Sequence, residues 1–397
     1  MALSIVVLSV HSIEEVLEPR SGGCELLASL IDELRPICTV RYISITSFKD
    51  LPSLSTMVLM QYYRSGVRST IRSLERGSYG LVRLLGFIIL NFLLLIDLSL
   101  YVSLMNVFRE VKPKYVMIHY TDYPVLLLIC RVLGQKVIGI CGELTYLRYL
   151  ELSSGPSVVV DHLVRILGCI EVNCLRKCLL VLSFSLIETI FLCSFGVRVF
   201  FGPLLLKLPR RAVEGPRFAE PTFVFFGSDF EPNVEAVFVL DRVVGALKRV
   251  GVALRCRVVG RVTRLVSKFV KFCELVGEVP SLEDVVGGSI VVIPQVKGLF
   301  GSRSKIVKSL YLGLPVVALA RAVPDPYLKL LGNGALLVAS NIGELLSLLL
   351  VLSSDESLVQ RARSSATRVR EVIMQLRDMY IKYLRKLVLV GDEETYH

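Results

Sequence analysis

Short apolar runs alternate with segments of helical periodicity along almost the whole chain. Because parallel strands need a crossover between them, usually a helix, this alternation is typical of parallel α/β architecture. The first half predicts strands at Leu3–Val10, Ile37–Ile45, Tyr115–His119, Lys136–Cys141, Leu179–Leu182 and Val197–Phe200. The second half predicts strands at Thr222–Phe226, Leu254–Val259, Ile290–Ile293, Pro315–Ala318 and Ala335–Val338. We therefore expect an α/β fold of two Rossmann-like, doubly wound domains.

A proline-rich stretch separates the two series of strands. Residues 202–221 read GPLLLKLPRRAVEGPRFAEP, with four prolines and a basic run, which is typical of a linker. We predict one domain over 1–205 and a second over 206–380. A last helix, from about Glu356 to Val390, is expected to pack back toward the first domain, with its end and the tail at 381–397. Since ligand loops lie at the carboxyl ends of parallel strands, we expect the binding site in a cleft between the domains.

One apolar segment is much longer than the short apolar runs found elsewhere in the chain. Residues 84–105 read LLGFIILNFLLLIDLSLYVSLM, which is long enough to cross a bilayer, but Asp97 lies within it and argues against a span. A basic stripe precedes the segment, with arginine at every fourth position: Arg64, Arg68, Arg72 and Arg76. Two interpretations stay open. The arginines are solvated and followed by a buried helix, or the two helices lie on an anionic membrane surface.

Composition and charge narrow the class of partner. The chain has 397 residues, of which 53% are hydrophobic, so two domains can each bury a core. The net charge of +11 favours an anionic partner: nucleic acid, an acidic membrane face or a phosphorylated small molecule. Nucleic acid is disfavoured, because the basic residues are not interleaved with aromatic side chains. The first twelve residues lack the basic start of a secretory signal, so we expect a buried first strand.

The ten cysteines are expected to be reduced residues of an apolar interior. They stand singly among Leu, Val and Ile, without CxxC spacing, which favours a cytoplasmic protein. Cys169, Cys174 and Cys178 form the one cluster with some likeness to a metal site. The step from Cys174 to Cys178 also fits one apolar helix face, so we expect no metal. Scarce Asn and Gln, with abundant Arg, Val and Leu, suggest a thermophile.

A candidate anion site follows the predicted strand at Ile290–Ile293. Residues 301–317, GSRSKIVKSLYLGLPVV, place Ser302 as the cap of a predicted helix and Arg303 and Lys305 in its first turn. Unpaired backbone N–H groups, the positive end of the helix dipole and two cations suit a diphosphate. A solvated helix start that carries basic residues is the alternative.

The same stretch resembles the donor-site helix and following strand of group 1 (family 4-like) glycosyltransferases, which have the two-domain GT-B fold. Residues 223–240, FVFFGSDFEPNVEAVFVL, resemble the opening of that family's second domain. Residues 276–295, VGEVPSLEDVVGGSIVVIPQ, are similar to the segment before the donor helix. In the first half, PRSGG at 19–23 and LLVLSFSLIETIFLCSFGVRV at 179–199 resemble the first glycine loop and the last unit before the hinge. These five blocks, in the family's order, cover most of the chain.

The resemblance implies an acceptor-side first domain and a donor-binding second domain. The implied donor-binding residues are Gly22, Gly23, Gly227, Ser228, Val279, Ser302, Arg303, Lys305 and Lys308. Arg303 and Lys305 would grip the pyrophosphate of a nucleotide-sugar, and the backbone around Val279 would face the base. The glycines would leave room for phosphate or sugar, although each also fits a tight turn alone. The nucleotide-sugar is a substrate, so no cofactor is implied.

Two positions depart from the family pattern. Many members carry two glutamates separated by seven residues, the second of which accepts hydrogen bonds from the ribose diol. Here Phe300 and Lys308 take those positions. An ammonium group donates but cannot accept, so Lys308 cannot hold a diol as a carboxylate does. Lys308 is either a third cation near the phosphates or a solvated side chain, and donor recognition has changed or catalysis has been lost.

Three residues are candidates for the catalytic acid or base. His119 ends a first-domain strand in HYTDYP, Asp122 follows it, and Glu143 follows the next strand in CGELTY. A helix-capping aspartate and a histidine satisfied by the backbone are the structural alternatives. The resemblance implies transfer of a sugar from a nucleotide-sugar to a glycan or lipid-linked acceptor, without an essential metal, at the cytoplasmic membrane face or in the cytoplasm. An inactive GT-B scaffold and a sugar-nucleotide epimerase are the rival interpretations.

Overall fold

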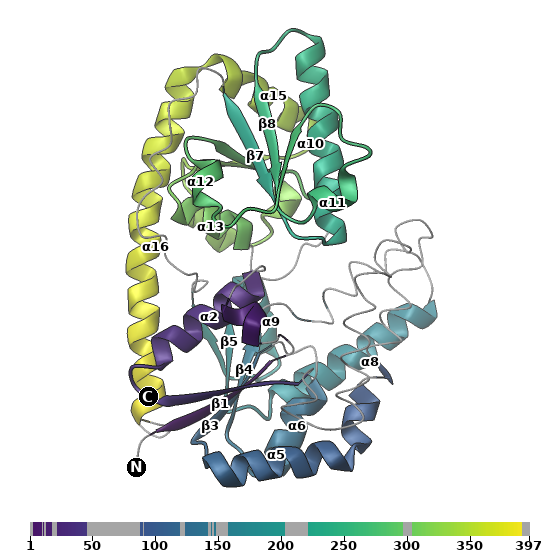
Figure 1. Cartoon of the computed structure of the whole chain (residues 1–397), viewed down its shortest axis with the longest axis vertical. Helices are drawn as coiled ribbons and strands as arrows, with labels where there is room; N and C mark the ends of the chain where they lie inside the picture. The colour runs from purple at the N-terminus through teal and green to yellow at the C-terminus, as the bar shows by residue number, and fades with distance from the viewer. Residues whose placement is uncertain are drawn as a thin grey trace. The chain divides into compact units, whose positions relative to one another are not determined.

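The computed structural model describes most of the chain as two separate α/β units (Figure 1). Its described residues are 3–9, 11, 13–17, 22–45, 88–89, 91–119, 124–141, 144, 147, 158–202, 221–296 and 304–390. The first unit contains Met1–Lys207, Phe300–Ser302 and Arg377–His397, and the second contains Leu208–Leu299 and Arg303–Leu376. The expected linker between the two series of strands falls mostly on 203–220, outside the described residues.

The first unit has a six-stranded parallel sheet in the order β2-β1-β3-β4-β5-β6. Its strands are β1 (Ser4–Ser9), β2 (Thr39–Ser44), β3 (Tyr115–His119), β4 (Val137–Cys141), β5 (Leu180–Ser183) and β6 (Val199–Phe201). Its helices are α1 (Ile13–Leu17), α2 (Gly22–Leu34), α5 (Leu98–Val111), α6 (Pro124–Val132), α8 (Val158–Leu175) and α9 (Leu186–Ser194). The strand order reverses between β1 and β3, and ligands of such sheets bind at the carboxyl ends of the strands at this point.

The second unit repeats this architecture in the order β12-β11-β10-β7-β8-β9, again all parallel. Its strands are β7 (Thr222–Phe226), β8 (Arg255–Val259), β9 (Glu274–Gly277), β10 (Ile290–Ile293), β11 (Val316–Leu319) and β12 (Leu336–Ala339). Its helices are α10 (Glu231–Arg249), α11 (Thr263–Val266), α12 (Glu283–Val286), α13 (Ser304–Tyr311), η1 (Ala320–Ala322), α14 (Pro326–Leu331) and α15 (Ile342–Ser354). Here the order reverses between β7 and β10, so the carboxyl end of β7 is the expected ligand position.

The eleven predicted strands are all present, and the fold class is confirmed. The prediction missed β9, because its four residues lack a continuous apolar run. β9 is an edge strand, and none of its residues is fully buried. The ladder between β8 and β9 also shifts register at Val258 and Val259. A short, half-exposed edge strand therefore leaves too weak a hydrophobic signal to be recognised.

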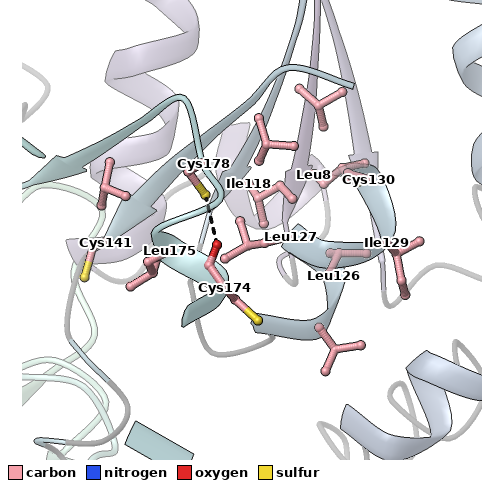
Figure 2. Packing of buried hydrophobic residues seen from close by; sticks show 14 of the residues in the cluster. Leu8, Ile118, Leu126, Leu127, Ile129, Cys130, Cys141, Cys174, Leu175 and Cys178 are labelled. Atoms are coloured by element: carbon pink, nitrogen blue, oxygen red, sulfur yellow. Dashed lines mark hydrogen bonds between the residues drawn. The ribbon is translucent and has the colours of Figure 1, made fainter. Parts of the chain in front are cut away.

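The buried cysteines pack as apolar side chains (Figure 2). Cys174 and Cys178 lie against Leu175, Leu127 and Ile118 in the core of the first unit, whereas Cys169 is exposed. The Cys178 thiol points to the Cys174 carbonyl oxygen at 3.9 Å. Burial raises the pKa of Cys174 to about 11 and that of Cys178 to about 12, so both remain neutral thiols. Among the described residues, no group of three or more His, Cys, Asp or Glu is placed to hold a metal ion.

The long apolar segment is interrupted by a helix cap. Asp97 is the N-cap of α5, and its carboxylate accepts hydrogen bonds from the backbone N–H groups of Ser99 and Leu100. One side of the helical stretch is buried and the other is exposed. Its buried side chains include Leu94, Leu100, Leu104 and Phe108, and its exposed ones include Phe92, Ile96, Leu98 and Val102. No helix in the described part of the chain is long and apolar enough to cross a membrane.

A bridging carboxylate ties the last helix, α16 (Glu356–Val390), to α2 within the first unit. Glu33 accepts from the Arg377 and Arg385 guanidinium groups, at 2.8 Å to each of its two carboxylate oxygens. The Arg385 Nε also donates to the Glu33 carbonyl oxygen at 3.1 Å. The Arg377 side chain is only 9% exposed, so loss of Glu33 would leave a nearly buried cation without this partner.

We expect Glu33→Gln to destabilise the first unit by about 1–3 kcal/mol, because removing one partner of a buried ion pair leaves the other charge desolvated. Thermal unfolding followed by circular dichroism should show a midpoint several degrees lower. Asp32→Asn is the matched control, because Asp32 lies on the same helix and its ion pair with Arg35 is exposed on both sides. Equal midpoints for the two variants would show that the bridge contributes nothing.

Candidate functional site

In the first unit, three polar side chains meet at the carboxyl ends of β1 and β3. Ser9 ends β1 and His119 ends β3, and the Ser9 hydroxyl lies 3.2 Å from His119 Nδ1. The backbone N–H of His11 donates to the same hydroxyl at 3.2 Å. The His11 and His119 rings lie 5.7 Å apart, centroid to centroid. The strand order therefore places a paired imidazole site at the position where doubly wound sheets bind ligands.

The two imidazoles have opposite tendencies to carry a proton. Burial opposes protonation of His11, but the side chains of Cys24 and Glu15 outweigh it and raise the pKa of His11 to about 9. The Glu15 carboxylate lies 3.4 Å from His11 Nδ1. Burial lowers the pKa of His119 well below its usual range, and the charge on His11 adds to this shift. At neutral pH, His11 is a cation and His119 is neutral, a separation typical of acid and base sites.

His119 is almost completely buried. It is 2% exposed, and the partly exposed member of the pair is His11. A base role for His119 requires the tautomer in which Nδ1 donates to Ser9, because Nε2 then keeps its lone pair. The other two sequence candidates, Asp122 and Glu143, lie outside the described residues.

Sequence reasoning missed Ser9, His11 and Glu15, although His11 follows the first strand by only two residues. It also missed a buried carboxylate on α9. Ser185 caps α9 by accepting a hydrogen bond from the Glu188 backbone N–H, and the Glu188 carboxylate accepts from the Leu144 backbone N–H at 2.9 Å. Leu144 directly follows Glu143 in the sequence. Gly22 and Gly23 occupy the first turn of α2.

In the second unit, the carboxyl end of β7 carries the predicted Gly227 and Ser228. The Asn233 side chain on α10 donates to the Ser228 carbonyl oxygen at 2.9 Å and accepts from Gln295 at 2.9 Å. Gln295 follows β10, so this buried amide pair joins the two strands at which the order reverses. The loop after β7 is thereby fixed by hydrogen bonds at the expected ligand position.

Glycines occupy the ends of three neighbouring strands in this unit. Gly227 follows β7, Gly260 follows β8 with φ +101°, and Gly277 ends β9 with φ +87°. A Cβ on Gly260 would lie 2.4 Å from the Gly227 carbonyl oxygen, so only glycine fits there. The Gly260 N–H donates to the Gly277 carbonyl oxygen at 2.6 Å. Val279, the residue predicted to face a base, follows β9 and is half-buried.

Within the candidate anion site, the structure describes Lys305 on α13, and its side chain lies near β7. The Lys305 ammonium lies 5.9 Å from the centroid of the Phe225 ring, and Phe225 precedes Gly227 by two residues. Ser309 donates to the Lys305 carbonyl oxygen at 2.6 Å within α13. Lys308 lies one turn further along the same helix and is half-buried. Ser302, Arg303 and Phe300 lie outside the described residues.

Comparisons with solved structures agree on the fold. No family profile matches the sequence, and neither does any curated protein. HepE from Anabaena, solved with UDP-glucose, is similar over 98% of this chain and 99% of its own, with a TM-score of 0.60 and 11% identity. Sucrose-phosphate synthase from Thermosynechococcus elongatus is similar over 96% and 99%, with a TM-score of 0.62 and 12% identity.

A third structure, α,α-trehalose 6-phosphate synthase from Burkholderia multivorans, is similar over 98% of this chain and 99% of its own. Its TM-score is 0.60 and its identity is 12%. These likenesses extend over both units, and such low identities carry information about the fold alone. The fold is GT-B, as the resemblance to group 1 glycosyltransferases implied.

Proposed function

We propose that this protein is a glycosyltransferase that moves a sugar from a nucleotide-sugar to an acceptor. The observation that carries the proposal is the carboxyl end of β7 at the point of strand reversal, where Gly227 follows the strand and the Lys305 ammonium lies 5.9 Å from the Phe225 ring centroid. Backbone without side chains lets a diphosphate approach closely, and a cation beside it favours the charge. Full-length similarity to HepE, whose structure contains UDP-glucose, supports a donor of this class.

The proposed donor site stabilises the leaving nucleoside diphosphate. Ser302, Arg303 and Lys305 form the diphosphate cradle, and Lys308 adds a cation where the family has a carboxylate. Charge on the leaving diphosphate increases as the bond between sugar and phosphate breaks, so fixed cations stabilise the transition state more than the ground state. These side chains supply the neutralising charge, so the proposed reaction has no essential metal. Gly22, Gly23, Gly227, Ser228 and Val279 complete the proposed donor-binding set.

The paired imidazoles of the first unit form the proposed acid–base site. His119, held by Ser9, is the candidate base that takes a proton from the acceptor hydroxyl. His11 carries a positive charge at neutral pH and so favours a negatively charged group at the carboxyl ends of β1 and β3. Asp122 and Glu143 are the alternatives for the base.

The proposed reaction is tested by release of free nucleoside diphosphate. The wild-type protein is incubated separately with UDP-, GDP- and dTDP-sugars, and free UDP, GDP or dTDP is measured by chromatography. Thermal unfolding in the presence of each donor first identifies the one that binds, because a bound ligand raises the midpoint. Release from that donor supports transfer or hydrolysis. Binding without release from any donor would favour the inactive scaffold instead.

We further propose a glycan or lipid-linked acceptor and a peripheral contact with the cytoplasmic membrane face. The exposed apolar side chains before and within α5 support this contact, since apolar groups on a helix surface suit the lipid interface. The arginine stripe of the sequence supplies positive charge for anionic headgroups. Its four members, Arg64, Arg68, Arg72 and Arg76, lie outside the described residues.

We expect the Arg64, Arg68, Arg72 and Arg76→Gln variant to lose binding to anionic vesicles, because each cation near such a surface contributes about 1 kcal/mol. Co-sedimentation with vesicles of phosphatidylserine and phosphatidylcholine measures the bound fraction, and vesicles of phosphatidylcholine alone are the control. Equal sedimentation of wild type and variant, or no sedimentation of either protein, would contradict the membrane proposal.

A further inference from the structure

We propose that Arg261 is a further diphosphate-binding side chain of the donor site, held by Asp229 in the ligand-free protein and transferred to the ligand on binding. This inference rests on the proposed function. It goes beyond the sequence prediction, which placed the cations of the donor site on the loop and helix after β10 alone.

The fold fixes Arg261 beside the carboxyl end of β7. β7 and β8 are paired neighbours, with Phe226 opposite Val259, and Arg261 follows β8 by two residues. The loop that carries it is hydrogen-bonded to both adjacent strand ends. The Val262 N–H donates to the Gly227 carbonyl oxygen at 3.2 Å, and the Gly260 N–H donates to Gly277. The backbone on both sides of Arg261 is therefore fixed relative to the glycines of the candidate site.

Arg261 and Lys305 come from the two strands that flank β7. The sheet order is β10-β7-β8, Lys305 lies on the helix that follows β10, and Arg261 lies on the loop that follows β8. Lys305 reaches the Phe225 ring of β7. A diphosphate bound over Gly227 would therefore meet a cation from each neighbouring strand. Two cations on opposite sides suit the two phosphate groups better than a single cluster would.

The pairing of Arg261 with Asp229 is incomplete. Its Nη2 lies 3.4 Å from Asp229 Oδ1, longer than a charge-assisted hydrogen bond of about 2.7–2.9 Å. The Nε is buried, and no hydrogen-bond acceptor among the described residues lies within reach of it. The two side chains are 29% and 28% exposed, so solvent or a ligand can reach them. A guanidinium has five donors and binds phosphate with two of them at once, so this one retains capacity for a ligand.

Arg264, on the short helix α11 that follows this loop, forms a complete surface ion pair. Its Nη2 donates to Glu278 at 2.8 Å, and its side chain is 69% exposed. Arg264 is three residues from Arg261 and pairs with Glu278, which follows β9. Unlike the pair of Arg261 and Asp229, this pair is already at the distance of a charge-assisted hydrogen bond. It is therefore a matched control for the loss of one arginine near the carboxyl end of β8.

The test is calorimetric titration of variants with inorganic pyrophosphate, UDP and GDP. Arg261→Gln should weaken binding of the diphosphate that the wild type binds by about ten- to a hundredfold, and Arg264→Gln should not change it. Asp229→Asn should strengthen binding by about two- to fivefold, because the carboxylate no longer competes for the guanidinium. The double variant should bind like Arg261→Gln, since Asp229 acts only through Arg261.

The outcomes separate this inference from the proposed function. Unchanged binding by Arg261→Gln, or an equal loss in Asp229→Asn, would show that the pair is structural and would overturn the assignment alone. Absence of any binding by the folded wild type would overturn the proposed function and this assignment together. Thermal unfolding midpoints of all variants establish that they are folded, and a loss of affinity counts only at an unchanged midpoint.

Discussion

His119→Ala is expected to lower turnover by about 10²- to 10⁴-fold while donor affinity stays nearly unchanged, which is the effect of removing a general base. The expectation rests on the position of His119 at the carboxyl end of β3 and its contact with Ser9. A neutral imidazole can accept a proton, whereas the charged His11 beside it cannot. Steady-state rates and calorimetric affinities for the same donor measure the two quantities separately.

The control for this variant is His162→Ala, because His162 lies on α8 and is exposed. It should leave both turnover and affinity unchanged. If His119→Ala loses donor affinity and rate together, or unfolds, the buried imidazole shapes the site instead of acting as the base. Asp122 or Glu143 would then be the candidate base, and the Glu188 contact with Leu144 would make Glu143 the first to test.

Arg303→Ala is expected to weaken nucleoside diphosphate binding by about ten- to a hundredfold, which corresponds to one charge-assisted hydrogen bond of about 1.5–3 kcal/mol. The loss should be smaller for a nucleoside monophosphate, which lacks the second phosphate. Lys305→Ala should have a comparable effect, because its ammonium already lies beside β7. Calorimetric titration with UDP, UMP, GDP and GMP measures both differences. Equal losses for diphosphate and monophosphate would place these cations away from the second phosphate.

Lys308→Glu is the complementary variant at the position that departs from the family pattern. A carboxylate accepts hydrogen bonds from a diol, and an ammonium cannot, so the change should improve recognition of the ribose if the rest of the pocket is present. Affinities for UDP and its 2′-deoxy form isolate this contact. A variant that binds both nucleotides less tightly than wild type would instead make Lys308 a third phosphate-binding cation.

The sequence predicted the elements well because buried parallel strands leave a strong local signal. Ile5–Leu8 and Phe223–Phe226 are continuous apolar runs, and both lie in central strands. Gly227 and Lys305 follow their predicted strands in the chain, so the sequence could name them, but it did not single out Gly260, Gly277 or Arg261. β9 was missed because an edge strand with half-exposed residues lacks that signal.

Contacts between loops could not be predicted in the same way, because they depend on the order of strands in the sheet. Ser9 meets His119 across 110 residues because β1 pairs with β3. Asp229 meets Arg261 because β7 pairs with β8. No periodicity or residue spacing in the sequence indicates either contact. The protonation states of His11 and His119 follow from burial and neighbours, so they too required the structure.

Calorimetric titration of the wild-type protein with UDP, GDP and dTDP tests the central claim most directly, because it requires no knowledge of the acceptor. The account predicts that one of the three binds, and that the corresponding nucleoside monophosphate binds at least tenfold more weakly, about 1.4 kcal/mol or more. Absence of binding by all three to protein that unfolds cooperatively on heating would contradict it. In that case the fold is present without a donor site, and the protein is a scaffold.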